Sequence, residues 1–246
     1  MFSFQKIVFP IFLFFLSCQS PKSENAQEII QKALHQSGFD KSSFSVDFDF
    51  RDYHYTLIRK PSFYSFSRST IQKDVEVKDV MTSSKPLQRF IDGKMILLSD
   101  SLQRVYSNSL NSVMYFFQLP KPLQDTAAIN ELVGAVVIHG ETYWTLKVTF
   151  KEEGGGEDFQ DEYRYWINQK NHEIDYLAYN YLTDGGGTRF RRAVNKRKIE
   201  GIFFQDYVNY KPFQKFEQLD SLPSLFEQEE LQQVSLIENK NIRVVK

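Results

Sequence analysis

Cysteine is almost absent from this sequence, since Cys18 is the single one among 246 residues. One thiol cannot form a disulfide within the chain, so the fold has to rest on its apolar core. Charge of one sign is not in excess either, because 31 acidic residues face 30 basic ones. That balance argues against nucleic acid as a partner and against a general attraction to an anionic membrane surface. Beyond the N-terminal region no apolar run approaches the ~18 residues of a membrane-spanning helix.

Signatures of catalysis and metal binding are also missing. There is no Gly-x-Ser-x-Gly turn for a nucleophilic serine, and no two of the four histidines have the spacing of metal ligands. Asp47 and Asp49 share a strand face, but alternating acids are common on strands and do not by themselves indicate a glycosidase. The acidic turn 152–158 could hold calcium, yet it lacks the ligand spacing of an EF-hand and is better explained as a hairpin tip. We therefore expect no catalytic residue, no metal and no cofactor.

The N-terminus has the pattern of a bacterial lipoprotein signal peptide. Lys6 supplies the positive charge, residues 7–16 form a short apolar run, and the small Ser17 precedes Cys18. In such leaders the segment before the cysteine is removed and the cysteine becomes a lipidated N-terminus. Phe15 stands where leucine is usual, so an ordinary secretory signal with an incidental Cys18 is the alternative. We expect three parts: a signal peptide over 1–17, a tether over 18–24 and a single β-rich domain over 25–246.

Lipidation of Cys18 sets the expected location of the protein. Acyl chains such as palmitate anchor a protein to a membrane without a membrane-spanning helix. We therefore expect a protein of the cell envelope that is anchored to a bacterial membrane through Cys18. The outer membrane is the expected site, with the folded part facing the periplasm.

Aromatic residues are abundant, at 15% of the chain, with 23 Phe, 13 Tyr and 2 Trp. These residues favour strands and fill wide cores. Near the N-terminus, by contrast, Ile29, Ile30, Ala33 and Leu34 lie at helical spacing, and Gly38 suits the left-handed end of a helix. The sequence therefore predicts one amphipathic helix followed by a β-rich body.

Period-two alternation begins near residue 43 and predicts antiparallel strands joined by short turns. The segments are 44–50, 53–60, 63–72, 75–82, 87–91, 95–99, 133–139, 143–151, 162–168, 174–182, 188–199 and 202–210. A helical insert over 108–132 interrupts them, and the tail carries a short helix near 224–233 and a last strand at 234–237 or 242–245. A meander of this length curls or closes to hide its edges. The predicted fold is mainly β (α+β): a strongly curved antiparallel sheet or half-barrel with the N-terminal helix packed in its concave face.

Several strings of the sequence resemble a family of bacterial envelope lipoproteins classed as a domain of unknown function. They are Phe-Arg-Asp at 50–52, LNSVMYFFQLP at 110–120, YRYWIN at 163–168, DYLAY at 175–179 and GGTRFR at 186–191. This family implies no activity and no site residues. The order of one helix followed by a meander is also similar to that of the LolA/LolB-like lipoprotein carriers, whose half-barrel holds acyl chains. This second resemblance concerns the layout alone.

The candidate ligand-binding residues are aromatic and basic. Tyr165, Trp166 and Tyr179 belong to strands with aromatic side chains on both faces, so either the convex face is covered or the concave face lines a cavity. Arg189 and Arg191 share a strand face and would lie near the head group of an amphiphilic ligand. The alternative for this basic cluster is a solvated strand paired with acids such as Asp161 or Asp175.

Two functions follow from these observations. The first is non-catalytic binding of an apolar or amphiphilic ligand, such as a lipid or a lipoprotein acyl chain, in the concave face. The alternative is an interaction or structural protein of the envelope whose aromatic core is filled and holds no ligand. An enzyme ranks third.

Overall fold

The computed structural model describes residues 24–154, 159–182 and 185–245. The helices are α1 (Ala26–Ser37), α2 (Asp100–Phe117), η1 (Lys121–Gln124), η3 (Leu219–Ser221) and α3 (Leu222–Glu227). The strands before α2 are β1 (Phe44–Phe50), β2 (Tyr53–Lys60), β3 (Phe63–Gln72), β4 (Val75–Thr82), β5 (Lys85–Ile91) and β6 (Lys94–Ile96). Those after it are β7 (Ala128–Ile138), β8 (Glu141–Phe150), β9 (Glu162–Asn168), β10 (Ile174–Tyr181), β11 (Gly187–Ile199), β12 (Ile202–Lys211), β13 (Gln232–Ile237) and β14 (Lys240–Val245).

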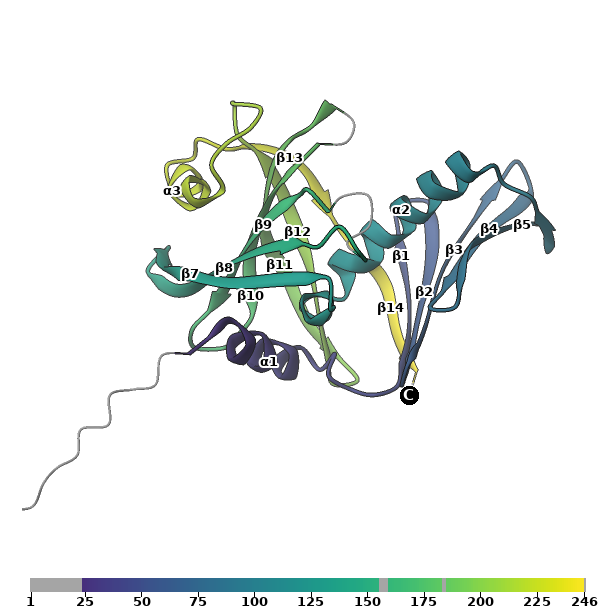
Figure 1. The fold of residues 1–246 in the computed structure, drawn as a ribbon, viewed down its shortest axis with the longest axis horizontal. Coiled ribbons are helices and arrows are strands. Elements are labelled where there is room, and N and C mark those ends of the chain that lie inside the picture. Colours follow the sequence, from purple (N-terminus) through teal and green to yellow (C-terminus); the bar gives the residue numbers. More distant parts are fainter. Residues whose placement is uncertain (1–23, 155–158, 183–184, 246) are drawn as a thin grey trace, which may run out of the picture.

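The strands form two antiparallel sheets of seven (Figure 1). The first sheet has the order β14-β1-β2-β3-β4-β5-β6, and the second has the order β13-β12-β11-β10-β9-β8-β7. Each sheet is a meander with one of the two C-terminal strands at its edge, β14 beside β1 and β13 beside β12. This is the mainly β fold with curved antiparallel sheets that the sequence predicts, and the curvature is divided between two sheets.

The chain crosses from the second sheet to the first between β13 and β14. Buried Asp206 holds this crossing, because its Oδ1 accepts hydrogen bonds from the backbone N–H of Asn239 at 2.9 Å and from Nη2 of Arg197 at 3.0 Å. Arg197 also donates to the carbonyl oxygen of Asn239 at 2.6 Å. The segment between β13 and β14 is therefore bonded to β11 and β12 where the chain changes sheets.

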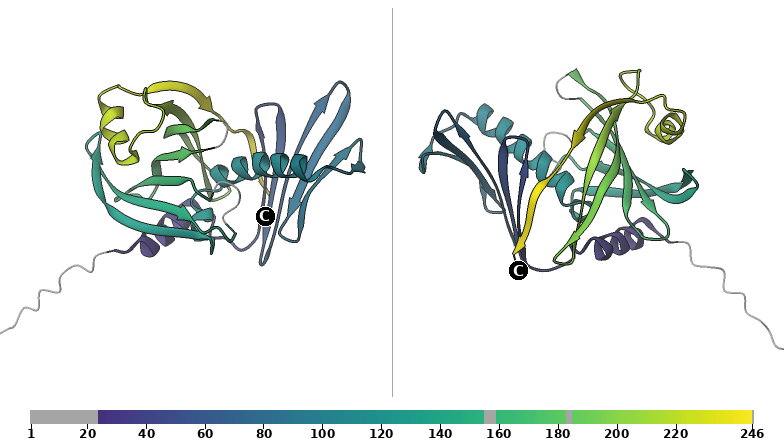
Figure 2. Two further views of the ribbon diagram at one scale, coloured as in Figure 1. Left: turned by 45° about the horizontal axis from the view of Figure 1, so that its top comes forward. Right: turned by 180° about the vertical axis from the view of Figure 1, so that it is seen from behind.

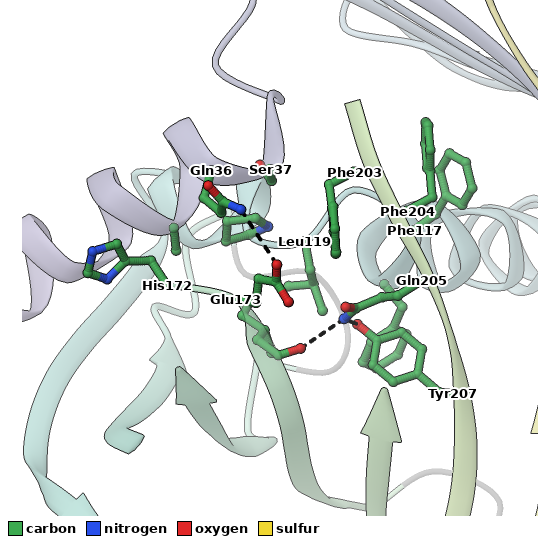
Figure 3. Close-up of a pocket in the computed structure, with 14 residues that line it drawn as sticks. Gln36, Ser37, Phe117, Leu119, His172, Glu173, Phe203, Phe204, Gln205 and Tyr207 are labelled. Atoms are coloured by element: carbon green, nitrogen blue, oxygen red, sulfur yellow. Dashed lines mark hydrogen bonds between the residues drawn. The ribbon is translucent and has the colours of Figure 1, made fainter. Parts of the chain in front are cut away.

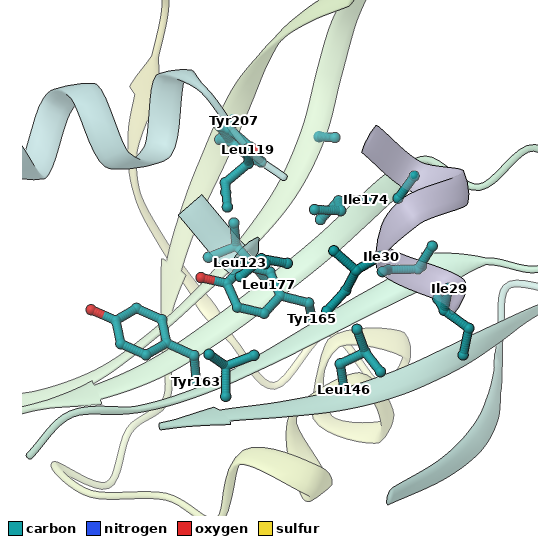
Figure 4. Packing of buried hydrophobic residues seen from close by; sticks show 14 residues of the cluster. Ile29, Ile30, Leu119, Leu123, Leu146, Tyr163, Tyr165, Ile174, Leu177 and Tyr207 are labelled. Carbon is teal, nitrogen blue, oxygen red and sulfur yellow. The ribbon is translucent and has the colours of Figure 1, made fainter. Parts of the chain in front are cut away.

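α1 ends at Gly38, as the sequence predicts. Asn25 caps its start: its side chain accepts from the N–H of Glu28 at 2.9 Å, and the Glu28 carboxylate accepts from the Asn25 N–H at 3.2 Å. Gly38 ends the helix with a φ of 73°, a left-handed conformation that glycine adopts without strain. Ile29 and Ile30 are fully buried against the inner face of the second sheet (Figure 4).

α2 crosses between the two sheets (Figure 2). Met114 and Phe117 pack with residues of the first sheet, and the ring of Phe117 stacks on that of Phe48 in β1 at 3.7 Å. Tyr115 and Phe116 pack against the inner face of the second sheet. The C-terminal half of α2 thus packs against both sheets, and a different set of its side chains contacts each of them.

The second sheet is covered on both faces. Its inner face carries Tyr163, Tyr165 and Leu177 under α1 and α2. Its outer face packs against the segment of η3 and α3, where Leu222 is fully buried beside Phe190. Aromatic residues on both faces are explained by this double cover.

Several expected elements differ from the structure, among them the strand expected over 95–99, which is the short β6 (Lys94–Ile96). The helix expected over 108–132 already starts at Asp100, and β7 begins at Ala128, where pairing with β8 extends the strand. In the tail, the helix ends at Glu227, and both candidates for a last strand form, as β13 and β14.

Candidate ligand-binding cavity

A cavity of about 420 Å³ lies between the two sheets, beside α2. This volume falls in the lower half of the range of pockets that hold one small molecule, roughly 300–1,000 Å³. One wall is the α2-facing side of the first sheet, with Tyr64, Phe66 and Met81. The opposite wall comes from the second sheet, with Phe150 and Tyr163. Side chains of α2 and the residues around η1 complete the lining: Ser107, Asn108, Asn111, Ser112, Tyr115, Phe116, Gln118, Pro122, Asp125 and Ala127.

A cation lines this cavity. Arg59, at the end of β2, is half-buried, and its guanidinium carbon lies 5.4 Å from the ring centre of Tyr64 and 5.5 Å from that of Phe66. Its Nε donates to Oε1 of Gln118 at 2.8 Å. Burial lowers the pKa of Arg59, although the group remains a cation.

A second pocket, at the junction of α1, the end of α2 and β12, has a volume of only about 30 Å³ (Figure 3). In its lining, Nε2 of Gln205 donates to the carbonyl oxygen of Ile174 at 2.9 Å and to the hydroxyl of Tyr207 at 2.7 Å, whereas Nδ1 of His172 is buried without a hydrogen-bond partner. Space of this size suits a water molecule and not an organic ligand.

Arg191 lies on the inner face of the second sheet, as the alternation of β11 predicts. The residue is only 8% exposed, with the ring of Phe116 at 3.9 Å from the guanidinium carbon, and its Nη2 donates to the Tyr179 hydroxyl at 2.8 Å. Its Nε is buried without a hydrogen-bond partner, as is Oδ1 of Asn209, the residue opposite it on β12. Phe116 covers Arg191, so this arginine does not line the cavity.

Arg189 lies closer to solvent on the same face. Its guanidinium carbon is 4.9 Å from the ring centre of Tyr181, and its Nη1 donates to the carbonyl oxygen of Thr188 at 2.9 Å. Within the described residues, neither Arg189 nor Arg191 forms an ion pair. Farther along β11, Lys196 pairs with Glu173 and Asp175, and Arg197 pairs with Asp206. The alternative of a basic strand paired with acids such as Asp175 therefore applies to Lys196 and not to Arg189 or Arg191.

The aromatic candidates do not all lie together. Tyr165 and Tyr179 share the inner face with Arg191, whereas Trp166 is buried on the outer face beside Phe190. The structure thus brings together Arg189, Arg191, Tyr165 and Tyr179 and separates Trp166 from them. Because alternate residues of a strand face opposite sides, Tyr165 and Trp166 cannot line one site.

Tyr115 connects α2 to this inner face. Its hydroxyl lies 2.7 Å from that of Tyr165, and both phenols are buried. Burial raises the pKa of each of them above its ordinary value, so both stay neutral at physiological pH. This hydrogen bond joins α2 to β9.

Other candidates from the sequence fall elsewhere. Cys18 and residues 155–158, the tip of the acidic turn, lie outside the described residues. Among the residues that are described, no three His, Cys, Asp or Glu side chains gather as a metal site. No helix in the described part of the chain has the length and apolar character to span a membrane.

Sequence reasoning missed Arg59, although a signal for it was present. Tyr55 and Leu57 are buried on the inner face of β2, and the next residue on that face is Arg59. An arginine at the end of a buried stripe indicates a cation that faces the interior. The sequence suggested a cavity in the concave face of one sheet, but its position could not be anticipated, because its walls come from both sheets.

Solved structures with a similar fold are known. A LolA superfamily protein from Nitrosomonas europaea is similar over 91% of this chain and 95% of its own, with 15% identity and a TM-score of 0.54. A putative outer membrane lipoprotein-sorting protein domain from Vibrio parahaemolyticus matches 89% of this chain and 93% of its own, with 7% identity and a TM-score of 0.45. The first of these likenesses shows a shared fold. No curated protein matches the sequence significantly.

The sequence strings pointed to a family of unknown function, and a family model confirms this. The model of a family of unknown function, DUF6503, matches residues 5–239. That span contains both sheets except β14, together with every candidate residue named above. The chain therefore belongs to the DUF6503 family.

Proposed function

We propose that the protein binds an apolar or amphiphilic ligand, such as a lipid or an acyl chain, without catalysing a reaction on it. The observation that carries this proposal is the cavity of about 420 Å³ between the two sheets, whose walls present Tyr64, Phe66, Met81 and Phe150. Aromatic and thioether side chains favour acyl chains through apolar burial. The fold shared with a LolA superfamily protein supports the same interpretation.

Membrane attachment is part of the proposal. The leader that ends at Cys18 supports a lipid anchor in the cell envelope of a bacterium, with the outer membrane as its site and the domain in the periplasm. A lipid or a lipoprotein acyl chain is then available to the cavity from the same compartment.

Arg189 and Arg191 remain candidates for the head-group end of the site, with Tyr165 and Tyr179 beside them. Arg191 carries a buried Nε without an acceptor and forms no ion pair within the described part of the chain. A ligand would reach it only after the Phe116 ring turned away. Trp166 is no longer part of the proposed site, because it faces α3.

A second candidate function has its own support. The inner face of the second sheet is filled by Ile29 and Ile30 of α1 and by Tyr115 of α2. A structural or interaction protein of the envelope would need only this filled core.

Native mass spectrometry of the purified protein separates the two functions. We expect co-purifying lipid, and we expect Ser112→Trp, which places an indole in the cavity from α2, to lower lipid occupancy about tenfold. Ser101→Trp is the matched control, because Ser101 is exposed on the same helix and does not line the cavity. Absence of bound lipid, together with no uptake of added lipid, would leave the structural function.

The arginine assignment has a separate test. If Arg189 and Arg191 contact a head group, the double change to alanine weakens lipid retention while the melting temperature stays close to that of the wild type. Unaltered retention would remove these two residues from the site.

A further inference from the structure

Arg59 places a positive charge in the cavity lining, and a purely apolar ligand would make no polar contact with it. Its Nε is held by Gln118, whose side chain is almost fully buried and in turn donates from Nε2 to the carbonyl oxygen of Met114 at 2.8 Å. The rings of Tyr64 and Phe66 flank the guanidinium. These contacts orient the side chain and use only one of its five N–H donors.

The other donors of Arg59 are unpaired. Within residues 24–154, 159–182 and 185–245, the two terminal nitrogens have no hydrogen-bond acceptor, and no carboxylate lies within 4 Å of the guanidinium. Asp125 lines the same cavity, but its Oδ1 accepts from the backbone N–H of Ala127 at 2.9 Å. Lys121 lies close enough for its pKa to be lowered by burial and by the charge of Arg59. Arg59 and Asp125 are thus the charged side chains of the cavity lining, and the charge of Asp125 also acts on Arg59.

The two walls next to Arg59 differ in polarity. The α2 wall presents hydroxyl and amide groups, from Ser107, Asn108, Asn111 and Ser112. The sheet walls present Met81 and aromatic rings, among them Phe66 and Phe150. A free anion would use the cation alone, whereas a molecule with a charged head and an apolar chain uses the cation and the apolar walls together.

We infer that the ligand is a single-chain amphiphile with an anionic head group, a carboxylate or a phosphate. Arg59, which lines the cavity, binds this head group through its terminal nitrogens in place of Arg189 and Arg191, which do not line it. The chain of the ligand lies along the aromatic walls of the cavity. This inference rests on the proposed function and adds the class of ligand and the residue that recognises it.

The test compares ligands that share one chain. Palmitate, palmitoyl lysophosphatidic acid and neutral monopalmitoylglycerol are each titrated into the full mature protein below their micelle concentrations, with isothermal titration calorimetry as the readout. We expect both anionic ligands to bind about tenfold or more tightly than the neutral one, which is the value of one charge-assisted hydrogen bond.

Variants of Arg59 locate the effect. Arg59→Gln should lose the preference for anionic ligands and bind monopalmitoylglycerol as the wild type does, and Arg59→Lys should keep part of the preference. Lys60→Gln is the matched control, because it removes the same charge at the exposed neighbouring position of β2 and should change nothing. The wild-type comparison needs no variant and holds even if Arg59→Gln folds poorly.

The outcomes separate this inference from the proposed function. Equal affinity for the neutral and anionic ligands would overturn the role of Arg59 and leave the lipid-binding cavity intact. Binding of none of the three would overturn both. Displacement of palmitate by excess inorganic phosphate would assign a site for free anions and would refute the amphiphile.

Discussion

Two features of the structure require glycine at position 38: a left-handed backbone conformation and a close contact with another segment. The φ of 73° at Gly38 favours glycine, and a Cβ at this position would lie 2.2 Å from the carbonyl oxygen of Gly201 in the β11–β12 turn. We predict that Gly38→Ala lowers the free energy of unfolding by about 2–5 kcal/mol, from left-handed strain together with the steric overlap. Urea denaturation measures this change.

Gly140 is the control for the Gly38 substitution. Its φ of 79° is similar, but no atom lies within 4 Å of the position that a Cβ would take there. Gly140→Ala should therefore cost only the conformational part, about 1–2 kcal/mol. Equal losses for the two variants would show that the contact between α1 and the β11–β12 turn contributes nothing.

Single residues of the site were predictable only where strand alternation decides them. Alternation placed Arg189 and Arg191 together and Phe190 opposite, and the structure has this arrangement. The same rule separates Tyr165 from Trp166, although both were candidates for one site. That Phe116 covers Arg191 could not be predicted, because α2 is far from β11 in the sequence.

At the scale of elements, the packing of α2, β9 and β12 buries tyrosine hydroxyls in their neutral form. Burial raises the pKa of Tyr207 on β12 to about 12, and the pKa values of Tyr115 and Tyr165 are also raised. Above about pH 10 the unfolded chain loses these protons while the folded one keeps them, so stability should fall as pH rises. Tyr207 alone accounts for on the order of 3 kcal/mol between about pH 10 and 12. Urea midpoints measured from pH 8 upward should show this loss.

Tyr207→Phe identifies the contribution of one phenol. This variant lacks the ionisable group, so its stability should fall less steeply above about pH 10 than that of the wild type. Identical slopes for the two proteins would mean that Tyr207 ionises as freely in the folded state as in the unfolded one.

Strand bounds were predictable where short turns flank an alternating run. The bounds expected for β2, β3, β4 and β9 agree with the structure, because turn residues and period-two alternation end at the same positions. The start of β7 was missed, since residues 128–132 become a strand only through their pairing with β8. That pairing cannot be predicted from the sequence of residues 128–132 alone.

For the molecule as a whole, the proposed attachment to a membrane has the most direct test. We predict that Cys18→Ala abolishes metabolic labelling with a palmitate analogue and releases the protein from the membrane fraction, because Cys18 is the only thiol that could carry an acyl chain. A Ser17→Ala variant, which keeps a small residue before the cysteine, should still be labelled. Persistent labelling of Cys18→Ala would contradict the lipoprotein leader.

The residue pattern alone was enough to establish a mainly β chain with one capped N-terminal helix, because helical and strand periodicities and turn residues act over a few neighbouring positions. The division into two sheets, the cover of the second sheet by α3, and the cavity beside Arg59 depended on the tertiary structure. Each of these features joins segments that lie far apart in the chain, as where Tyr64 of β3 and Tyr163 of β9 line one space. Burial and side-chain packing between distant elements decide such contacts, and no local pattern encodes them.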